Sequence, residues 1–293
     1  MRIVDTHVHI WNTEEYRLPW LDGEGPTLNR IWTAADYLDE QRGADEYTID
    51  KAVYIEVDMA ADERPRENEL AVALVDDPST PFAGACISGD LSDPHFADYI
   101  RPLAAKPQIK GVRQVLHVPS AAPGTCLGET FVDNVRLLGE LGLVFEGCVR
   151  NPELVDLATL ARKCPDTTVI VDHMGIVDAD IAGLEHPQGD DATYLDAWRR
   201  NLADLGSLNN TVCKVSGLNP AQPWSTQTLG RAVSVAFDSF APDKLMFASN
   251  FPVLNVALTL DEWVRAMLDI TNDMAPQARE AFFSGNAERV YSL

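Results

Sequence analysis

The sequence is poor in the features that mark several large classes of protein. No apolar run approaches the roughly 18 residues that a membrane-spanning helix needs. The N-terminus has no basic segment followed by an apolar one, so we expect no signal peptide. The 293 residues include no internal repeat, low-complexity tract or linker-like stretch. These absences favour a globular fold and predict that no membrane is a partner.

Cysteine is scarce and scattered along the chain. The five cysteines are odd in number and include no CxxC pair; they are Cys86, Cys126, Cys148, Cys164 and Cys213. This pattern argues against a disulfide framework and against a zinc site built from cysteines. It favours reduced thiols, and we therefore expect a cytoplasmic protein.

Basic residues are also few. The chain has 23 Lys and Arg against 45 Asp and Glu, which gives a formal net charge of −22 at pH 7. Nucleic acid and anionic membrane surfaces are therefore disfavoured, and a small-molecule substrate is the partner we expect. An anionic substrate would need a local Arg or Lys. The sequence leaves the oligomeric state open, a homo-oligomer included.

What is present is a regular alternation of short β-rich apolar runs with amphipathic helical runs. The predicted strands are 3–10, 51–57, 82–88, 109–115, 143–149, 168–173, 211–216 and 244–249. Helical patterns cover 34–46, 65–76, 94–105, 129–141, 152–163, 194–205, 226–240, 259–270 and 276–284. Several predicted strands are apolar on both faces, as a parallel sheet covered by helices requires.

Eight strand–helix units predict an α/β fold of the (β/α)8 TIM-barrel type, with residues 1–293 as a single domain. A doubly wound sheet is the alternative, but the glycine-rich phosphate loop that this fold places after its first strand is missing. The long segment 11–32 follows the first strand and is rich in Trp, Pro and Gly. In a barrel it would lie over the mouth.

The first predicted strand carries His7 and His9, two residues apart. Side chains at i and i+2 of a strand point to the same face, so the two imidazoles should lie side by side. Imidazole is the commonest metal ligand in proteins. This pair is the smallest useful part of a metal or substrate site.

Nearly all of the remaining predicted strands also end in polar residues. Barrel enzymes carry their catalytic residues at these carboxyl ends. They are Glu56, Asp58, Arg113, His117, Glu146, Asp172, His173, Lys214, Ser216, Ser249 and Asn250. Asp172 and His173 are adjacent, so we expect them to face opposite ways. Lys214 could pair with an acid inside the barrel.

His7, His9 and His173 could supply three neutral nitrogen ligands to zinc and leave an open position for water. Glu56 is the expected carboxylate, as a fourth ligand or as the general base. The planar guanidinium of Arg113 suits a substrate carboxylate or an oxyanion. Further substrate contacts are expected from three residues: His117, Trp32 and Trp224.

Six short motifs in order resemble the amidohydrolase superfamily, in its amidohydrolase 2 branch of sugar lactonases and 2-pyrone-4,6-dicarboxylate hydrolase. They begin at Asp5 (DTHVHIW), Lys110 (KGVR), Val171 (VDHMG), Lys214 (KVSGL), Phe247 (FASNFPV) and Gly285 (GNAERVY). The resemblance covers essentially the whole chain. It implies a (β/α)8 barrel that hydrolyses a cyclic ester, with His7, His9 and His173 as metal ligands or substrate contacts.

The chain departs from this family at the end of the eighth strand. The family usually has Asp there, in a Ser-Asp-Trp-Pro pattern, as general base and often as metal ligand; this chain has Asn250. An amide cannot accept a proton from water near neutral pH. Three interpretations stay open: the base has moved, with Glu56 as the candidate; the site works with little or no metal; or the protein binds a ligand without turnover.

The leading hypothesis is a hydrolase that opens a small polar lactone, carboxylated or polyhydroxylated. Glu56, His173 and Asn250 are its expected catalytic residues, with Asn250 orienting the water or the carbonyl. A divalent metal, zinc or manganese, is the expected cofactor, and metal-independent catalysis stays open. The alternatives are a decarboxylase of a small aromatic or unsaturated acid and a non-catalytic ligand-binding relative.

Overall fold

A computed structural model describes residues 1–221 and 223–293 and contains eight parallel strands in the order β1 to β8. The strands are β1 (Arg2–Val8), β2 (Thr48–Ile55), β3 (Phe82–Ser88), β4 (Ile109–Val115), β5 (Val144–Cys148), β6 (Val169–Val171), β7 (Thr211–Val215) and β8 (Leu245–Phe247). The segment after β8 meets β1: the Asn250 N–H donates to the His7 carbonyl at 2.9 Å, and the His9 N–H donates to the Phe251 carbonyl at 2.7 Å. The sheet is therefore a nearly closed barrel, which confirms the predicted fold.

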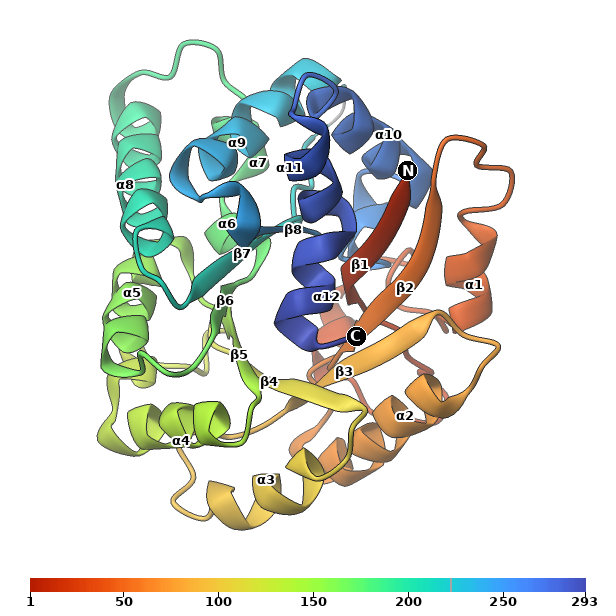
Figure 1. Cartoon of the computed structure of the whole chain (residues 1–293), viewed down its shortest axis with the longest axis vertical. Helices are drawn as coiled ribbons and strands as arrows, with labels where there is room; N and C mark the ends of the chain where they lie inside the picture. The colour runs from red at the N-terminus through yellow and green to blue at the C-terminus, as the bar shows by residue number, and fades with distance from the viewer. Residues whose placement is uncertain (222) are drawn as a thin grey trace.

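Helices alternate with the strands and surround them (Figure 1). They are α1 (Ala34–Asp39), α2 (Arg64–Asp76), α3 (Phe96–Ala104), α4 (Glu129–Glu140), α5 (Leu154–Lys163), α6 (His173–Ile176), α7 (Ala179–Ala182), α8 (Gly189–Gly206), α9 (Thr226–Ser239), α10 (Leu260–Ile270), α11 (Pro276–Glu280) and α12 (Asn286–Tyr291). Among the described residues, no helix is long and apolar enough to cross a membrane.

The apolar core has two parts. One lies between the strands and the surrounding helices. The other fills the barrel interior and includes Val53, Ile170 and Met246, joined by Ala287 and Tyr291 of α12. Figure 1 shows α12 lying across the centre of the strands, so the C-terminal helix packs onto one end of the barrel. The opposite end is left for the site.

The predicted elements differ from the observed ones mainly at their ends. The predicted helix 34–46 ends at Asp39, because the chain turns through Gly43, whose φ is +88°. Four predicted strands run two residues beyond the observed ends of β1, β2, β6 and β8. Just beyond three of these ends the backbone becomes left-handed, at Asp58 (φ +50°), His173 (φ +54°) and Asn250 (φ +64°). These residues leave the sheet and reach the barrel mouth.

Candidate active site

A cavity of about 470 Å³ opens at the carboxyl ends of the strands. The polar side chains that line it are Glu24, Asp58, His9, Arg113, His117, Cys148, His173, Asn219 and Asn250. The segment 11–32 contributes Trp20, Glu24 and Leu28 to its wall. The volume suits a small ligand.

Three imidazoles lie together at the strand ends: His9 and His173 line the cavity, and His7 is buried next to them. His7 Nε2 lies 3.1 Å from His9 Nε2, and the ring centroids of His7 and His173 are 4.4 Å apart. Burial lowers the pKa of all three imidazoles, and the charges of Lys214 and Arg113 lower it further. All three rings are therefore neutral at pH 7, the form in which a histidine can bind a metal.

The spacing of the His7 and His9 nitrogens suits two ligands of one divalent ion. Two nitrogens that each bind a tetrahedral zinc at 2.0–2.1 Å lie about 3.3 Å apart, close to the observed 3.1 Å between His7 and His9. His9 Nδ1 is held by the Ile55 carbonyl at 2.9 Å, and His173 Nδ1 by the Ser216 hydroxyl at 2.9 Å. Each of these contacts leaves Nε2 of its ring for the cavity, as the supporting bonds of metal-binding histidines do.

Glu56 and Arg113 form a buried pair beside the histidines. Arg113 Nε donates to Glu56 Oε1 at 2.5 Å, and Arg113 Nη2 donates to the Glu56 carbonyl at 2.7 Å. The second carboxylate oxygen of Glu56 accepts the Asp58 N–H at 2.7 Å. Both oxygens of Glu56 are thus in use, and most of the Arg113 fork faces protein. Glu56 stands here as the partner of Arg113, and not as a free ligand or base.

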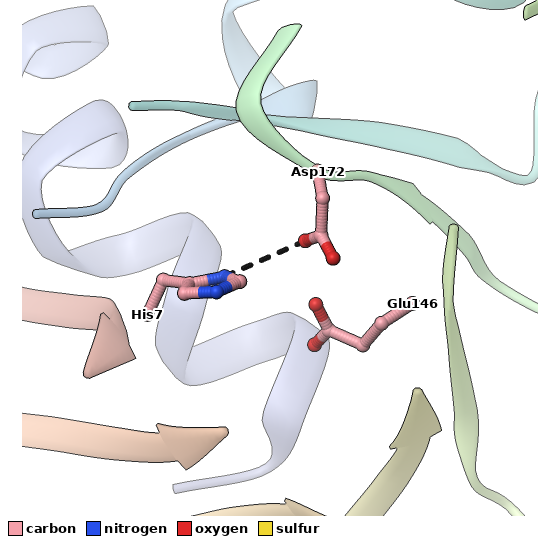
Figure 2. Close-up of side chains that lie close together, drawn as sticks. All are labelled: His7, Glu146 and Asp172. Atoms are coloured by element: carbon pink, nitrogen blue, oxygen red, sulfur yellow. Dashed lines mark ion pairs between the residues drawn. The ribbon is translucent and has the colours of Figure 1, made fainter. Parts of the chain in front are cut away.

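A second group of acids lies deeper in the barrel. Figure 2 shows Glu146 and Asp172 converging on His7, with Asp172 Oδ1 3.5 Å from His7 Nδ1. The Lys214 ammonium occupies the same place: it donates to Glu146, lies 3.6 Å from Asp172 Oδ1 and is 3.3 Å from His7 Nδ1. This cluster already contains its cation, so it is a poor site for a metal ion.

The pairing of Lys214 with an acid follows the sequence expectation, but the orientation expected for Asp172 is wrong. Asp172 and His173 do not face opposite ways, because both approach His7. The left-handed φ of His173 breaks the alternation that an extended strand would impose. Asp172 is completely buried. Among the described residues, neither of its carboxylate oxygens has a hydrogen-bond partner.

The KVSG motif, which begins at Lys214, contacts two of the three histidines. Lys214 contacts His7, and Ser216 bonds to His173. Gly217 has φ +71°, and a Cβ built there would lie 2.5 Å from the His173 Cβ. A glycine is therefore required at position 217 if the His173 imidazole is to keep its observed position.

Asn250 and Asp58 line the cavity from different strand ends, and both have left-handed backbones. A left-handed backbone costs conformational energy in a non-glycine residue, and such residues are frequent at functional sites. Burial raises the pKa of the Asp58 carboxyl, and the charge of Glu56 raises it further. The sequence pointed to Asp58 as a strand-end acid but assigned it no role.

The expected aromatic contacts lie elsewhere. Among the described residues that line the cavity, the tryptophan is Trp20, and neither Trp32 nor Trp224 is present. Trp32 is buried against Phe251 and pairs with Trp11 through the backbone, so its ring serves packing. His117 does line the cavity, with Nδ1 3.3 Å from Cys148 Sγ. Burial lowers its pKa to about 4.

The whole chain is similar to known amidohydrolases. The amidohydrolase family model matches residues 4–293. An amidohydrolase 2 from Bifidobacterium longum subsp. infantis is 30% identical, with a TM-score of 0.76 and coverage of 100% of this chain and 99% of that one. The L-fucono-1,5-lactonase of Burkholderia multivorans is 24% identical, covering 99% of this chain and 96% of its own.

A further structure shares the fold. It is an amidohydrolase from Burkholderia multivorans with bound zinc, 22% identical, with a TM-score of 0.83 and full coverage of both chains.

Proposed function

Because the chain belongs to the amidohydrolase family, we propose that its cavity hydrolyses a small, neutral, polyhydroxylated lactone. The observation that carries the proposal is a cluster of three neutral imidazoles and Arg113, of which His9, His173 and Arg113 line one small cavity and His7 contacts them from the buried side. A lactonase relative that covers nearly the whole chain supports the reaction class.

The charges around the cavity favour a neutral substrate over a carboxylated one. Arg113 is the cation among the described lining residues, and Glu56 already neutralises it. Glu24 and Asp58 add two carboxylates to the wall. An anionic substrate would meet net negative charge, whereas sugar hydroxyls can donate to these acids and to the Asn219 and Asn250 amides.

His7, His9 and His173 are the residues proposed to hold a divalent metal, zinc or manganese. When bound, such an ion polarises a carbonyl and lowers the pKa of water. A structure with the same fold contains bound zinc, which supports zinc as a candidate ion. The remaining Nη1 of Arg113, 3.5 Å from His7 Nε2, lies where it can stabilise a developing oxyanion.

Asp58 is the proposed general base in place of Glu56, while Asn250 keeps the orienting role. The carboxylates nearest the histidines are not free to act as a base: Glu56 is paired with Arg113, Glu146 is paired with Lys214, and Asp172 is completely buried. Asp58 removes a proton from a water molecule as the water oxygen attacks the lactone carbonyl carbon. The ring C–O bond then breaks, the ring oxygen takes up the proton that Asp58 removed, and a hydroxy acid leaves.

A substrate panel tests this proposal. We expect neutral sugar lactones to turn over with kcat/KM at least about 100-fold above that for pyrone dicarboxylates, since a like-charge mismatch costs several kcal/mol. The assay follows acid release, with and without added zinc or manganese. Release of carbon dioxide from an aromatic acid, without lactone turnover, would identify a decarboxylase. Ligand binding without any turnover would identify a non-catalytic binding protein.

A further inference from the structure

His7 lies between groups that make opposite demands on its single ring proton. Four polar groups approach the two ring nitrogens: His9 and Arg113 at Nε2, and Lys214 and Asp172 at Nδ1. A neutral imidazole carries one proton, so one nitrogen donates and the other accepts. The four contacts cannot all be satisfied at once.

With the proton on Nε2, His7 satisfies its two closer neighbours. His9 Nδ1 must hold a proton, because its partner is the Ile55 carbonyl, so His9 Nε2 is a lone pair that accepts from His7 at 3.1 Å. His7 Nδ1 then accepts from the Lys214 ammonium at 3.3 Å. Asp172 then keeps its ion pair with Lys214, at 3.6 Å, but accepts no hydrogen bond from the described residues.

With the proton on Nδ1, the pattern reverses. His7 Nδ1 can donate to Asp172 Oδ1, which lies 3.5 Å away and is otherwise without a hydrogen bond among the described residues. His7 Nε2 becomes a lone pair that faces the lone pair of His9 Nε2 across 3.1 Å. Two facing lone pairs repel, unless a cation lies between them.

We propose that Asp172 and Lys214 are positioning residues that select opposite tautomers of His7, Lys214 the metal-free one and Asp172 the metal-binding one. Metal binding then moves the ring proton from Nε2 to Nδ1 and gives the buried Asp172 carboxylate its missing hydrogen bond. The inference rests on the proposed three-histidine site and is independent of the reaction carried out there.

The tautomer is directly observable. Nitrogen-15 NMR of the histidine rings distinguishes protonated from bare ring nitrogens, and a His7→Gln variant assigns the His7 signals. We expect the His7 proton on Nε2 in metal-free protein and on Nδ1 after addition of one equivalent of zinc. The same His7 tautomer in both states would overturn the proposal.

The Asp172→Asn variant gives a second readout, zinc affinity measured by calorimetry. Loss of a carboxylate that supports a metal-binding histidine typically lowers metal affinity 10- to 100-fold, and we expect a loss in this range. Glu67→Gln is the matched control, because Glu67 is buried but bonds to the Val57 N–H and contacts none of the three histidines through a hydrogen bond. Wild-type zinc affinity in Asp172→Asn contradicts the assigned role.

The outcomes also separate this inference from the proposed function. Failure of the wild-type protein to bind zinc or manganese overturns the metal site and the tautomer exchange together. Lactone turnover in that metal-free protein would still leave the proposed reaction standing.

Discussion

Asp58→Asn is expected to lower kcat/KM for a neutral sugar lactone by about 100- to 10,000-fold, the usual contribution of a general base. Asn keeps the shape of the side chain but cannot take a proton. Asp58 is the cavity carboxylate beside the Glu56–Arg113 pair, and its N–H bond to Glu56 holds it there. We expect the loss in kcat more than in KM, because proton removal belongs to the transition state.

A second substitution makes this prediction sharper. Asn250→Asp, introduced into the Asp58→Asn variant, places a carboxylate on another wall of the same cavity. We expect the double variant to have a kcat/KM at least about tenfold above that of the Asp58→Asn single variant. Asp90→Asn is the control, since Asp90 is exposed, is absent from the cavity lining and should leave kcat/KM within about threefold of wild type. An Asp58→Asn variant with near wild-type activity would remove Asp58 from the mechanism.

Lys214→Met is expected to lower the free energy of unfolding by about 3–5 kcal/mol, the usual cost of removing one partner from a buried ion pair. Lys214 is completely buried and is the counter-charge of Glu146 and Asp172. Without it, two carboxylates share a dry site. Burial raises the pKa of Glu146 to about 7, although the charge of Lys214 opposes this rise.

The double variant Lys214→Met, Glu146→Gln should recover much of this loss, because it removes one buried carboxylate together with the ammonium. Urea unfolding of the single and double variants measures both effects. Lys51→Met is the control: the Lys51–Glu288 pair is partly exposed, at 3.3 Å, and should contribute about 1 kcal/mol or less. Equal losses in Lys214→Met and Lys51→Met would contradict the role given to the buried cluster.

The fold was predictable because its signals are local. Parallel strands covered by helices are apolar on both faces, and runs such as Val169–Val171 carry that pattern in the sequence. The ends of the strands were less predictable. There the left-handed backbones of Asp58 and His173 leave the extended pattern, and no simple periodicity marks them.

The site was predictable as far as strand geometry reaches. The two-residue spacing of His7 and His9, and the positions of Arg113 and His173 at strand ends, led to residues that meet at one end of the barrel. Contacts between distant segments were out of reach. Lys214 is 207 residues from His7, and pairing occupies both oxygens of Glu56, so its freedom as a base could be judged only in three dimensions.

Asn250 shows the same limit. The family resemblance implied a carboxylate at this position, and the sequence could not show which other acid lines the cavity; the structure places Asp58 there, and we propose it as the replacement.

The most direct test of lactone hydrolysis is turnover of a neutral sugar lactone in ¹⁸O-labelled water, with the product analysed by mass spectrometry. Attack of water on the carbonyl carbon predicts one ¹⁸O atom in the carboxylate of the hydroxy acid and none in the new hydroxyl group. The labelled acid should form well above the rate in buffer alone. Lactones that open no faster than in buffer, or carbon dioxide as the enzymatic product, would contradict the account.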